Sequence, residues 1–318
     1  MARGVGALAP TLKSLKTWAF APEVPAFDVS GPVCETTSRL LGGRRLILGF
    51  NVGKLEVTAR ELLVGSRFFS PLRYGYQFFF DRERYAHRLR MRNFYSSLIR
   101  KGDLVFDVGA HVGRYSEIFT DLGATVVSIE PNPRCCEQLR RLAKVRDVHV
   151  EQCAAGDTPG KLKLRICDNS VLSTVSEDYY QEASKSPIHK GEHWTESVDV
   201  QIVRLDQLAK RYGIPAFVKI DAEGYDDRVL LGMSFRPRVL TFEYHSHVVR
   251  DVPVRCFQAP VLSSGYEFNF SRGLSLTYAS EKWLGAKELQ ERLVEFAGDE
   301  VYGDVVARST SVDTAREG

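Results

Sequence analysis

The amino-acid sequence predicts an α/β fold in which a doubly wound, mostly parallel β-sheet carries helices on both faces. From residue 103 onwards, short apolar segments rich in β-branched residues alternate with segments whose apolar residues recur at helical spacing. Several of the apolar segments end in glycine or in an acidic residue. In such a sheet the carboxyl ends of the parallel strands meet at one edge, and ligands bind there beside the switch point of the strand order.

Each expected strand is a short apolar segment, and each expected helix has a periodic apolar face. After residue 113, for example, Tyr115, Ile118 and Phe119 lie at helical spacing, and Pro133 stands in the first turn of the next helix, where proline is favoured. We expect strands at 103–109, 124–130, 148–155, 160–166, 198–203, 216–221 and 238–245, and two more near 267–279. We expect helices at 81–100, 113–122, 133–144, 225–233, 254–264 and 286–297.

Composition places the 318-residue chain among globular proteins. Hydrophobic residues make up 44% of the chain and charged residues 26%, so it can bury a sizeable core. No segment approaches about 18 uninterrupted apolar residues, the length that a transmembrane helix requires, and we expect no transmembrane segment.

Charge is unevenly distributed along the chain. Residues 1–102 hold 17 Lys and Arg against 7 Asp and Glu, whereas the remainder holds 26 against 33. Such a basic first third fits an anionic partner, a membrane surface or a solvated helix. Within it arginines recur every four residues, at Arg84, Arg88 and Arg92. This pattern fits either a solvated helix face or a clamp that binds an anionic substrate. Nucleic acid fits poorly, because the rest of the chain is acidic and the pI is only about 8.5.

We divide the chain into four parts. Residues 1–45, rich in proline, glycine and small residues, form an irregular arm, and residues 46–102 form a basic, aromatic-rich accessory segment with a hairpin near 45–60. Residues 103–300 form the α/β domain, and residues 301–318 form a polar, frayed C-terminal tail.

The six cysteines indicate free thiols in a reducing compartment. None forms a Cys-x-x-Cys pair, and Cys135 and Cys136 are neighbours in an expected helix, a poor geometry for a disulfide. The first residues lack the compact apolar segment of a secretory signal. We therefore expect a cytoplasmic protein.

The end of the first strand carries the first candidate ligand contacts. Gly109 and Gly113 let the backbone turn sharply and approach a ligand, and the helix that follows directs free N–H groups at it. A dinucleotide site favours G-x-G-x-x-G, but His111 stands where the second glycine is expected. A small polar group such as an amino-acid moiety fits better than a pyrophosphate, and the Asp107 carboxylate can accept hydrogen bonds from its ammonium.

The next two strand ends extend the candidate cofactor site. Glu130 lies 21 residues after Gly109 and closes the second strand, where an acidic residue accepts the two hydroxyls of a ribose. Asp157, after the third strand, can accept from the exocyclic amine of an adenine or can serve only as a turn residue. An amino-acid moiety, a ribose and an adenine together describe S-adenosylmethionine.

The same segments resemble the FkbM family of S-adenosylmethionine-dependent methyltransferases. The resemblance rests on VFDVGAHVGRYS, SIEPNP, CAAGD, LDQL, VKIDAEGYD and LTFEYHSH, within residues 100–247. It implies a class I, Rossmann-like, seven-stranded sheet with one antiparallel strand near the C-terminus, a place that the strands near 267–279 fit. It also implies cofactor contacts by Asp107, Gly109, His111 and Gly113 on the methionine and ribose side, by Glu130 at the ribose and by Asp157 on the adenine side.

Two further strand ends supply candidate catalytic groups. Alternation along the strands places one set of polar side chains on a shared side of each: Lys219, Asp221 and Glu223 on one strand, and Glu243, His245 and His247 on the next. We expect His245 to remove the proton of an acceptor hydroxyl, with Asp221 and Glu223 as the next candidates. A Mg²⁺ ion held by Asp221, Glu223 and Glu243 is the competing hypothesis. We favour a site without metal, because no compact ligand spacing is evident.

The sequence therefore predicts an enzyme that moves a methyl group from S-adenosylmethionine to a hydroxyl oxygen of a sugar or small metabolite, with an anionic acceptor as one option. Two other classes stay open: a dinucleotide-dependent oxidoreductase on the same fold, and a cofactor-binding module without turnover that tethers a partner. The first would carry a G-x-G-x-x-G motif that is absent here. The second is disfavoured because Asp107, Glu130, Asp221 and His245 are all present.

Overall fold

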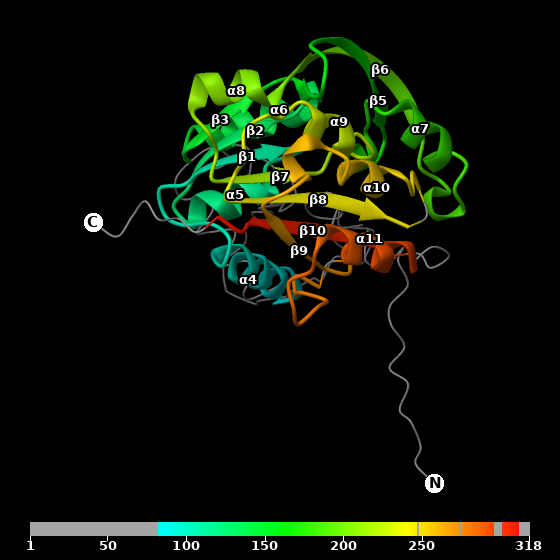
Figure 1. Ribbon diagram of the computed structural model, residues 1–318. Helices are drawn as coiled ribbons and strands as arrows, with labels where there is room; N and C mark the ends of the chain where they lie inside the picture. Colours follow the sequence, from blue (N-terminus) through cyan, green and yellow to red (C-terminus); the bar gives the residue numbers. More distant parts are fainter. Residues whose placement is uncertain (1–81, 247, 274, 296–300, 312–318) are drawn as a thin grey trace, which may run out of the picture.

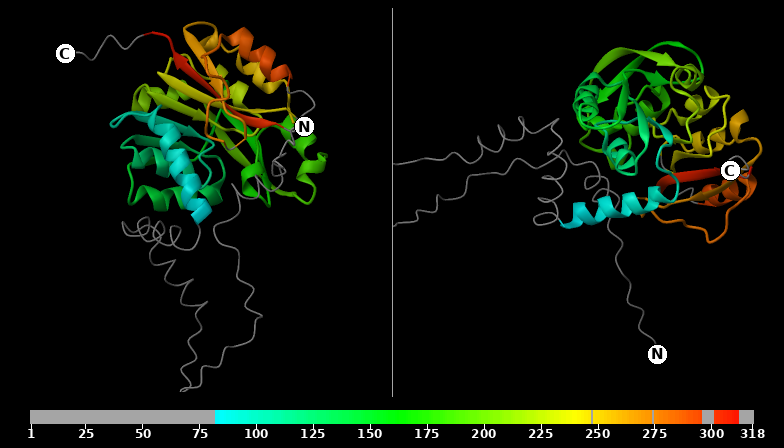
Figure 2. Two further views of the ribbon diagram at one scale, coloured as in Figure 1. Left: turned by 90° about the horizontal axis from the view of Figure 1, so that it is seen from below. Right: turned by 90° about the vertical axis from the view of Figure 1, so that its left-hand side faces the viewer.

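A computed structural model describes residues 82–246, 248–273, 275–295 and 301–311 of the chain (Figures 1 and 2). The expected arm over residues 1–45 lies outside these ranges. So do residues 46–81 of the accessory segment, with the expected hairpin and the aromatic run, and so does His247.

A seven-stranded sheet forms the centre of the described structure, in the order β3-β2-β1-β7-β8-β10-β9 (Figure 1). Neighbouring strands are parallel except at β10, which runs antiparallel to both β8 and β9. The doubly wound, mostly parallel sheet predicted from the sequence is thereby confirmed. In chain order the strands are β1 (Leu104–Val108), β2 (Thr125–Ile129), β3 (Val148–Glu151), β7 (Phe217–Ile220), β8 (Val239–His245), β9 (Tyr266–Phe270) and β10 (Tyr302–Ser309).

Helices cover both faces of this sheet because successive strand residues point to opposite sides. On β1, Phe106 and Val108 belong to one hydrophobic core and Val105 belongs to the other. The first core includes residues of α8 to α11, and the second includes residues of α4 and α5. The helices are α4 (Arg82–Ser96), α5 (Arg114–Asp121), α6 (Pro133–Ala143), α8 (Leu205–Tyr212), α9 (Asp226–Leu231), α10 (Val252–Cys256) and α11 (Ala286–Glu295).

A smaller, three-stranded sheet lies beyond the carboxyl ends of the parallel strands (Figure 1). It contains β4 (Ala154–Ala155), β5 (Gly160–Cys167) and β6 (Trp194–Val203), in the order β4-β6-β5. The expected strand over 148–155 is thus divided between two sheets, β3 in one and β4 in the other. The polar insertion between β5 and β6 contains the short helix α7 (Glu177–Ala183) and the 3₁₀ turns η1 (Ser170–Leu172) and η2 (Pro187–His189).

The prediction of a polar, frayed tail over residues 301–318 is wrong for the first half of this segment. Residues 302–309 form β10, which inserts between β8 and β9, and Val305, Val306 and Ala307 are all 0% exposed. The expected pair of strands near 267–279 is corrected as well, since only β9 forms there and β10 supplies the antiparallel strand. Three consecutive apolar residues within a polar segment are a weak signal, and the sheet buries them on both faces.

The structure also corrects the expected boundary between the accessory segment and the α/β domain, which the sequence analysis set at residue 102. Helix α4 packs Met91, Phe94 and Tyr95 into the same core as β1 and α5, so residues 82–102 belong to the α/β domain (Figure 2). Arg88 forms ion pairs with Asp121 and Glu117 of α5, and its side chain is 15% exposed. It is therefore neither a solvated residue nor an open clamp for an anion.

Two expectations about the whole chain can be compared with the described residues. None of the described helices is long and apolar enough to cross a membrane. The five described cysteines, at positions 135, 136, 153, 167 and 256, are buried and free, as expected from their spacing.

Candidate functional site

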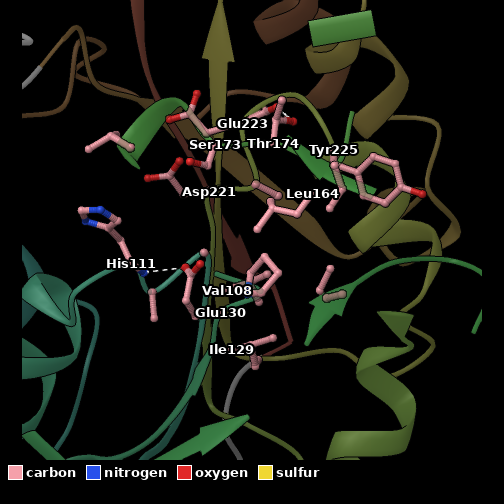
Figure 3. Close-up of a pocket in the computed structure, with 18 of the residues that line it drawn as sticks. Val108, His111, Ile129, Glu130, Leu164, Ser173, Thr174, Asp221, Glu223 and Tyr225 are labelled. Atoms are coloured by element: carbon pink, nitrogen blue, oxygen red, sulfur yellow. Dashed lines mark hydrogen bonds between the residues drawn. The ribbon is translucent and has the colours of Figure 1, made fainter. Parts of the chain in front are cut away.

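A pocket lies at the carboxyl ends of β1, β2, β4 and β7, beside the switch point between β1 and β7. The empty space that its lining encloses is about 860 Å³, counting the space open to solvent at its mouth. His111, Asp221 and Glu223 lie along one side, and Leu164 and Tyr225 lie on the other (Figure 3).

The two glycines after β1 have different structural roles. Gly109 has φ 74°, and a Cβ there would lie 1.8 Å from the carbonyl oxygen of Asp221. This close approach brings the turn after β1 against the end of β7 at the edge of the pocket, which both residues line. Gly113, with φ 84°, begins α5, and a Cβ there would lie 2.8 Å from Leu139 Cδ2 of α6. It allows close helix packing outside the pocket.

Glu130 lines the pocket at the end of β2 and is 6% exposed. Its two carboxylate oxygens accept hydrogen bonds from the backbone N–H groups of His111 and Asn132, each at 2.8 Å. Figure 3 shows the bond from His111. Burial raises the pKa of Glu130 to about 7 despite these bonds, and Asp107 and Asp221 add to the rise. Glu130 therefore titrates near neutral pH. Each oxygen can accept a second hydrogen bond, so the carboxylate can still bind a ligand hydroxyl.

His111 connects the turn after β1 to the insertion. Its backbone has φ 50°, and its Nε2 lies 2.7 Å from the Ser170 hydroxyl of η1. Burial lowers the pKa of His111 to about 4, and the nearby charge of Arg114 lowers it further. The imidazole is thus neutral at physiological pH, and its contact with Ser170 holds the wall of the insertion against the pocket.

Asp107 lies beneath the pocket rather than in its lining. Its side chain is 0% exposed, and Oδ2 accepts a hydrogen bond from the Ser116 hydroxyl at 2.6 Å. Burial raises the pKa of Asp107, and the charge of Lys219 and the bond from Ser116 oppose the rise. Ser116 in turn lies 2.7 Å from the Ser128 hydroxyl, so Asp107 joins β1 to the start of α5 and to β2.

Lys219 is buried in β7. A buried side chain that carries a charge needs a partner of opposite charge. Its Nζ donates to Asp221 Oδ2 at 2.8 Å and lies 4.2 Å from the centre of the Tyr115 ring. Burial by itself lowers the pKa of Lys219. The negative charges of Asp221, Asp107 and Asp304 outweigh this effect, so the pKa of Lys219 lies above its usual value. Lys219 thus offsets one carboxylate charge at the base of the pocket.

Glu223 lines the pocket on the same side as His111 and Asp221 (Figure 3). Its backbone has φ 46°, and its carbonyl accepts a hydrogen bond from the Thr174 hydroxyl of the insertion at 2.8 Å. Behind it, on β8, His245 Nε2 lies 2.8 Å from Glu243 Oε2. Neither Glu243 nor His245 lines the pocket.

The other half of the pocket is apolar. It forms a slot between strand ends of the main sheet and side chains of the smaller one, in which a flat ring could be held by apolar contact on both faces. The residues of this slot are Ile129, Pro131, Cys153, Ala154, Ala155, Leu164 and Val175.

The pocket brings together part of the set that the sequence predicted. Gly109, His111, Glu130, Asp221 and Glu223 line it. The other predicted site residues lie beneath or outside it: Asp107, Gly113, Asp157 and His245.

Asp157 lies outside the pocket. It pairs with Arg228 at 3.2 Å, and its backbone carbonyl accepts a hydrogen bond from Arg204 at 2.7 Å.

The sequence analysis missed the wall that residues 170–175 of the insertion form, and it missed Arg114. No motif marks this wall, because only its fold over the main sheet brings it there.

The chain is similar to known methyltransferases. Residues 107–254 match a family model described as the methyltransferase FkbM domain. The 31-O-demethyl-FK506 methyltransferase FkbM of Streptomyces tacrolimicus is 28% identical over 179 residues, which cover 49% of this chain and 68% of that protein. The ribosomal RNA large subunit methyltransferase E of Archaeoglobus fulgidus is 46% identical over 52 residues, 16% of this chain and 27% of that protein.

Solved structures of methyltransferases are similar at a greater distance. A precorrin-6y C5,15-methyltransferase from Geobacter metallireducens has a TM-score of 0.37 and 11% identity, with 70% of this chain and 87% of that chain covered. A putative RNA methyltransferase from Pyrococcus horikoshii has a TM-score of 0.34 and 11% identity, with 71% and 83% covered.

Proposed function

Because the chain carries an FkbM methyltransferase domain over residues 107–254, we propose that it transfers a methyl group from S-adenosylmethionine to a hydroxyl oxygen of a small molecule. One observation carries the proposal. A buried carboxylate that keeps capacity for hydroxyl groups, an apolar slot and two further carboxylates line one pocket at the switch point of the sheet.

The pocket fits the three parts of S-adenosylmethionine. Glu130 can accept hydrogen bonds from the two ribose hydroxyls, and the apolar slot beside it suits an adenine ring. At the other end, Arg114 can bind the carboxylate of the methionine moiety. Bound there, S-adenosylmethionine would supply an electrophilic methyl carbon next to a positively charged sulfur.

The residues of this chain then have to position the acceptor and take up its proton. The acceptor oxygen attacks the methyl carbon in line, so that the O–C bond forms as the C–S bond breaks and its electron pair stays on sulfur. We propose Asp221 as the group that receives the hydroxyl proton and Glu223 as the group that orients the hydroxyl. His245 contacts Glu243 instead of the pocket, so we propose a positioning role for it.

Two features support a small, uncharged acceptor. The acceptor side of the pocket carries the carboxylates of Asp221 and Glu223, which would repel an anion. The Streptomyces relative is named for an O-demethylated small molecule as its substrate. The free thiols of the described cysteines fit a reducing compartment, and we propose a cytoplasmic location.

Calorimetric titration with S-adenosylmethionine, S-adenosylhomocysteine and NAD tests the cofactor. We expect micromolar binding of the two sulfur compounds and none of NAD. Glu130→Ala should weaken that binding about 10- to 100-fold, since a hydrogen bond to a charged group is lost. Glu196→Ala is the matched control, because Glu196 lies on the surface in a pair with Arg134.

Binding of NAD alone would favour the oxidoreductase instead. Binding of none of the three compounds would favour the tethering module. If the sulfur compounds bind, a screen of hydroxylated small molecules and of RNA, read by mass spectrometry of the products, tests the acceptor class. Methylation of RNA alone would overturn the small-molecule assignment.

A further inference from the structure

The ammonium group of the methionine moiety still needs a partner in the pocket. The sequence analysis assigned this role to Asp107, but the Asp107 side chain is 0% exposed and lies beneath the pocket. Asp221 is the proposed acceptor of the hydroxyl proton, and it already accepts a hydrogen bond from Lys219. A different group must therefore accept a hydrogen bond from the ammonium.

The position of this ammonium follows from that of Arg114. In a methionine moiety the carboxylate and the ammonium are bonded to the same carbon atom, so a carboxylate bound by Arg114 brings the ammonium beside that residue. A cation close to a guanidinium is repelled unless other groups accept its hydrogen bonds and carry negative charge. The next residue in the chain, Tyr115, also lines the pocket and can meet the first need.

The ring of Tyr115 is held in place on several sides. Tyr115 lies in the first turn of α5, and its ring centre is 4.2 Å from Lys219 Nζ of β7. The ring centroids of Tyr95 and Phe119 lie 5.8 Å and 6.2 Å from that of Tyr115. Contacts with a cation and with two aromatic rings restrict the motion of the ring. Tyr115 therefore presents its hydroxyl from a defined position.

The Tyr115 hydroxyl makes no hydrogen bond to any residue that the structure describes. Its oxygen is not one of the fully buried polar atoms without a partner, so a ligand in the pocket can reach it. A phenol oxygen can accept a hydrogen bond and can donate its own proton at the same time. This hydroxyl can therefore bind a ligand group that donates, such as an ammonium.

The charges around this hydroxyl favour a cation next to Arg114. Burial raises the pKa of Tyr115 above its usual value; Lys219 and Arg114 act to lower this pKa, and Asp304 and Asp221 act to raise it. The phenol is therefore protonated at physiological pH, and two carboxylates lie close to it. Burial raises the pKa of Asp304 to about 6, so this carboxyl is ionised above neutral pH.

We propose that the Tyr115 hydroxyl accepts a hydrogen bond from the ammonium of the methionine moiety, and that the nearby Asp304 carboxylate of β10 stabilises this cation. The assignment rests on the proposed function, because it concerns the same cofactor in the same pocket. It makes Tyr115 a binding residue that selects ligands with an intact amino-acid group. A ligand without the ammonium gains no affinity from the Tyr115 hydroxyl.

Calorimetry with two ligands, on the full-length chain and its variants, tests the proposal. The ligands are S-adenosylhomocysteine and its analogue that lacks only the amino group. Tyr115→Phe removes one oxygen and keeps the ring over Lys219. It should weaken the binding of S-adenosylhomocysteine about tenfold or more, since a hydrogen bond from a charged group is lost, and leave the Kd of the analogue unchanged. Tyr278→Phe is the matched control, because Tyr278 is 37% exposed and does not line the pocket.

Asp304→Asn is the second variant. It removes a charge but keeps the hydrogen bonds that the Asp304 backbone forms with Ser271. We expect it to weaken the binding of S-adenosylhomocysteine about 2- to 5-fold and that of the analogue less. Circular dichroism and thermal unfolding show whether each variant is folded.

Two results would overturn the proposal. A folded Tyr115→Phe or Asp304→Asn protein that binds S-adenosylhomocysteine as tightly as the unchanged chain would remove the role of the substituted residue. Equal weakening of the two ligands would do the same, because it would indicate a general disturbance of the pocket rather than the loss of a contact with the ammonium.

Failure of this assignment can be told apart from failure of the proposed function. If the unchanged chain binds neither ligand, the pocket does not hold S-adenosylmethionine, and the proposed function falls together with the role of Tyr115. Binding of S-adenosylhomocysteine that does not depend on Tyr115 would remove only the ammonium contact and leave the methyl transfer in place.

Discussion

Lys219 donates a hydrogen bond to Asp221 at 2.8 Å, and it does so from a position that is 1% exposed. The two residues stand at the end of β7, one beneath the pocket and the other in its lining. The Asp221 side chain is 22% exposed. This ion pair fixes the orientation of one pocket carboxylate, and it explains how a lysine is accommodated within a buried parallel strand.

Lys219→Met is expected to lower the free energy of unfolding by about 3–5 kcal/mol, because it takes the Lys219 charge away from the fully buried Asp107 as well as from Asp221. Urea denaturation measures the effect. Lys163→Met breaks a pair with Asp199 whose side chains are both well exposed, and it should change stability by less than about 0.5 kcal/mol. Equal losses in the two variants would contradict the importance of the buried pair.

Gly109→Ala is expected to destabilise the protein by more than about 3 kcal/mol. The new Cβ would lie 1.8 Å from the Asp221 carbonyl oxygen, and the positive φ adds backbone strain. Gly160→Ala is a suitable comparison, since no atom lies within 4 Å of its added Cβ. Thermal unfolding of both variants gives the difference, and a Gly109→Ala protein as stable as Gly160→Ala would show that the two strand ends can separate.

Cofactor affinity should depend on pH through Glu130. Its pKa is raised to about 7, so the carboxyl becomes protonated as the pH falls through neutrality and can accept fewer hydrogen bonds from a ribose. Between pH 8 and pH 6 the Kd of S-adenosylmethionine should therefore rise in the unchanged protein. In Glu130→Gln the affinity should be lower and nearly independent of pH in this range, and a parallel pH dependence in both proteins would assign the titration to another group.

The same raised pKa affects stability with the opposite sign. In the folded state Glu130 binds its proton up to about pH 7, whereas in the unfolded chain it loses the proton near its ordinary pKa of 4.5. The folded state thus binds more protons between these two values. In the absence of cofactor, the contribution of Glu130 to the free energy of unfolding should fall as the pH rises from 4.5 to 7. Glu130→Gln should lack this part of the slope when urea denaturation is repeated across the window.

Ser170→Ala removes the hydroxyl that contacts His111 at 2.7 Å. We expect the affinity for S-adenosylmethionine to fall about 3- to 10-fold, the usual effect of one neutral hydrogen bond, because the wall of the insertion is held less firmly. Ser263→Ala, which removes a surface hydroxyl bonded to the Pro260 carbonyl, serves as the control. Calorimetry that gives the same Kd for both variants would exclude a role of this contact.

Truncation after residue 301 should abolish cooperative folding, because it removes β10 from between β8 and β9 and exposes both cores. Truncation after residue 311 leaves the strand intact and should keep the unfolding transition of the full chain. The two shortened proteins can be compared by circular dichroism during heating. A cooperative transition in the shorter one would show that β8 and β9 tolerate the loss.

Most of the strands and helices between residues 103 and 245 follow from local signals, although the sequence analysis did not expect α7 and α8. Apolar runs, helical periodicity and turn residues such as Gly109 depend on neighbouring positions in the chain, so they can be read without the fold. The segment 302–309 gave no comparable signal. Its apolar core is three residues long, and its position as a buried strand depends on pairing with β8, more than fifty residues earlier in the sequence.

The sequence by itself determined the doubly wound sheet and the strand ends that carry Gly109, His111, Glu130, Asp221 and Glu223, because strand direction brings such ends to one edge. Only the tertiary structure decided which polar residues face the pocket. It placed Asp107 beneath the pocket, paired Asp157 with Arg228, and set His245 beside Glu243. It also built the opposite wall from an insertion without a motif. These outcomes depend on packing and charge pairing between distant segments, and spacing along one chain does not encode them.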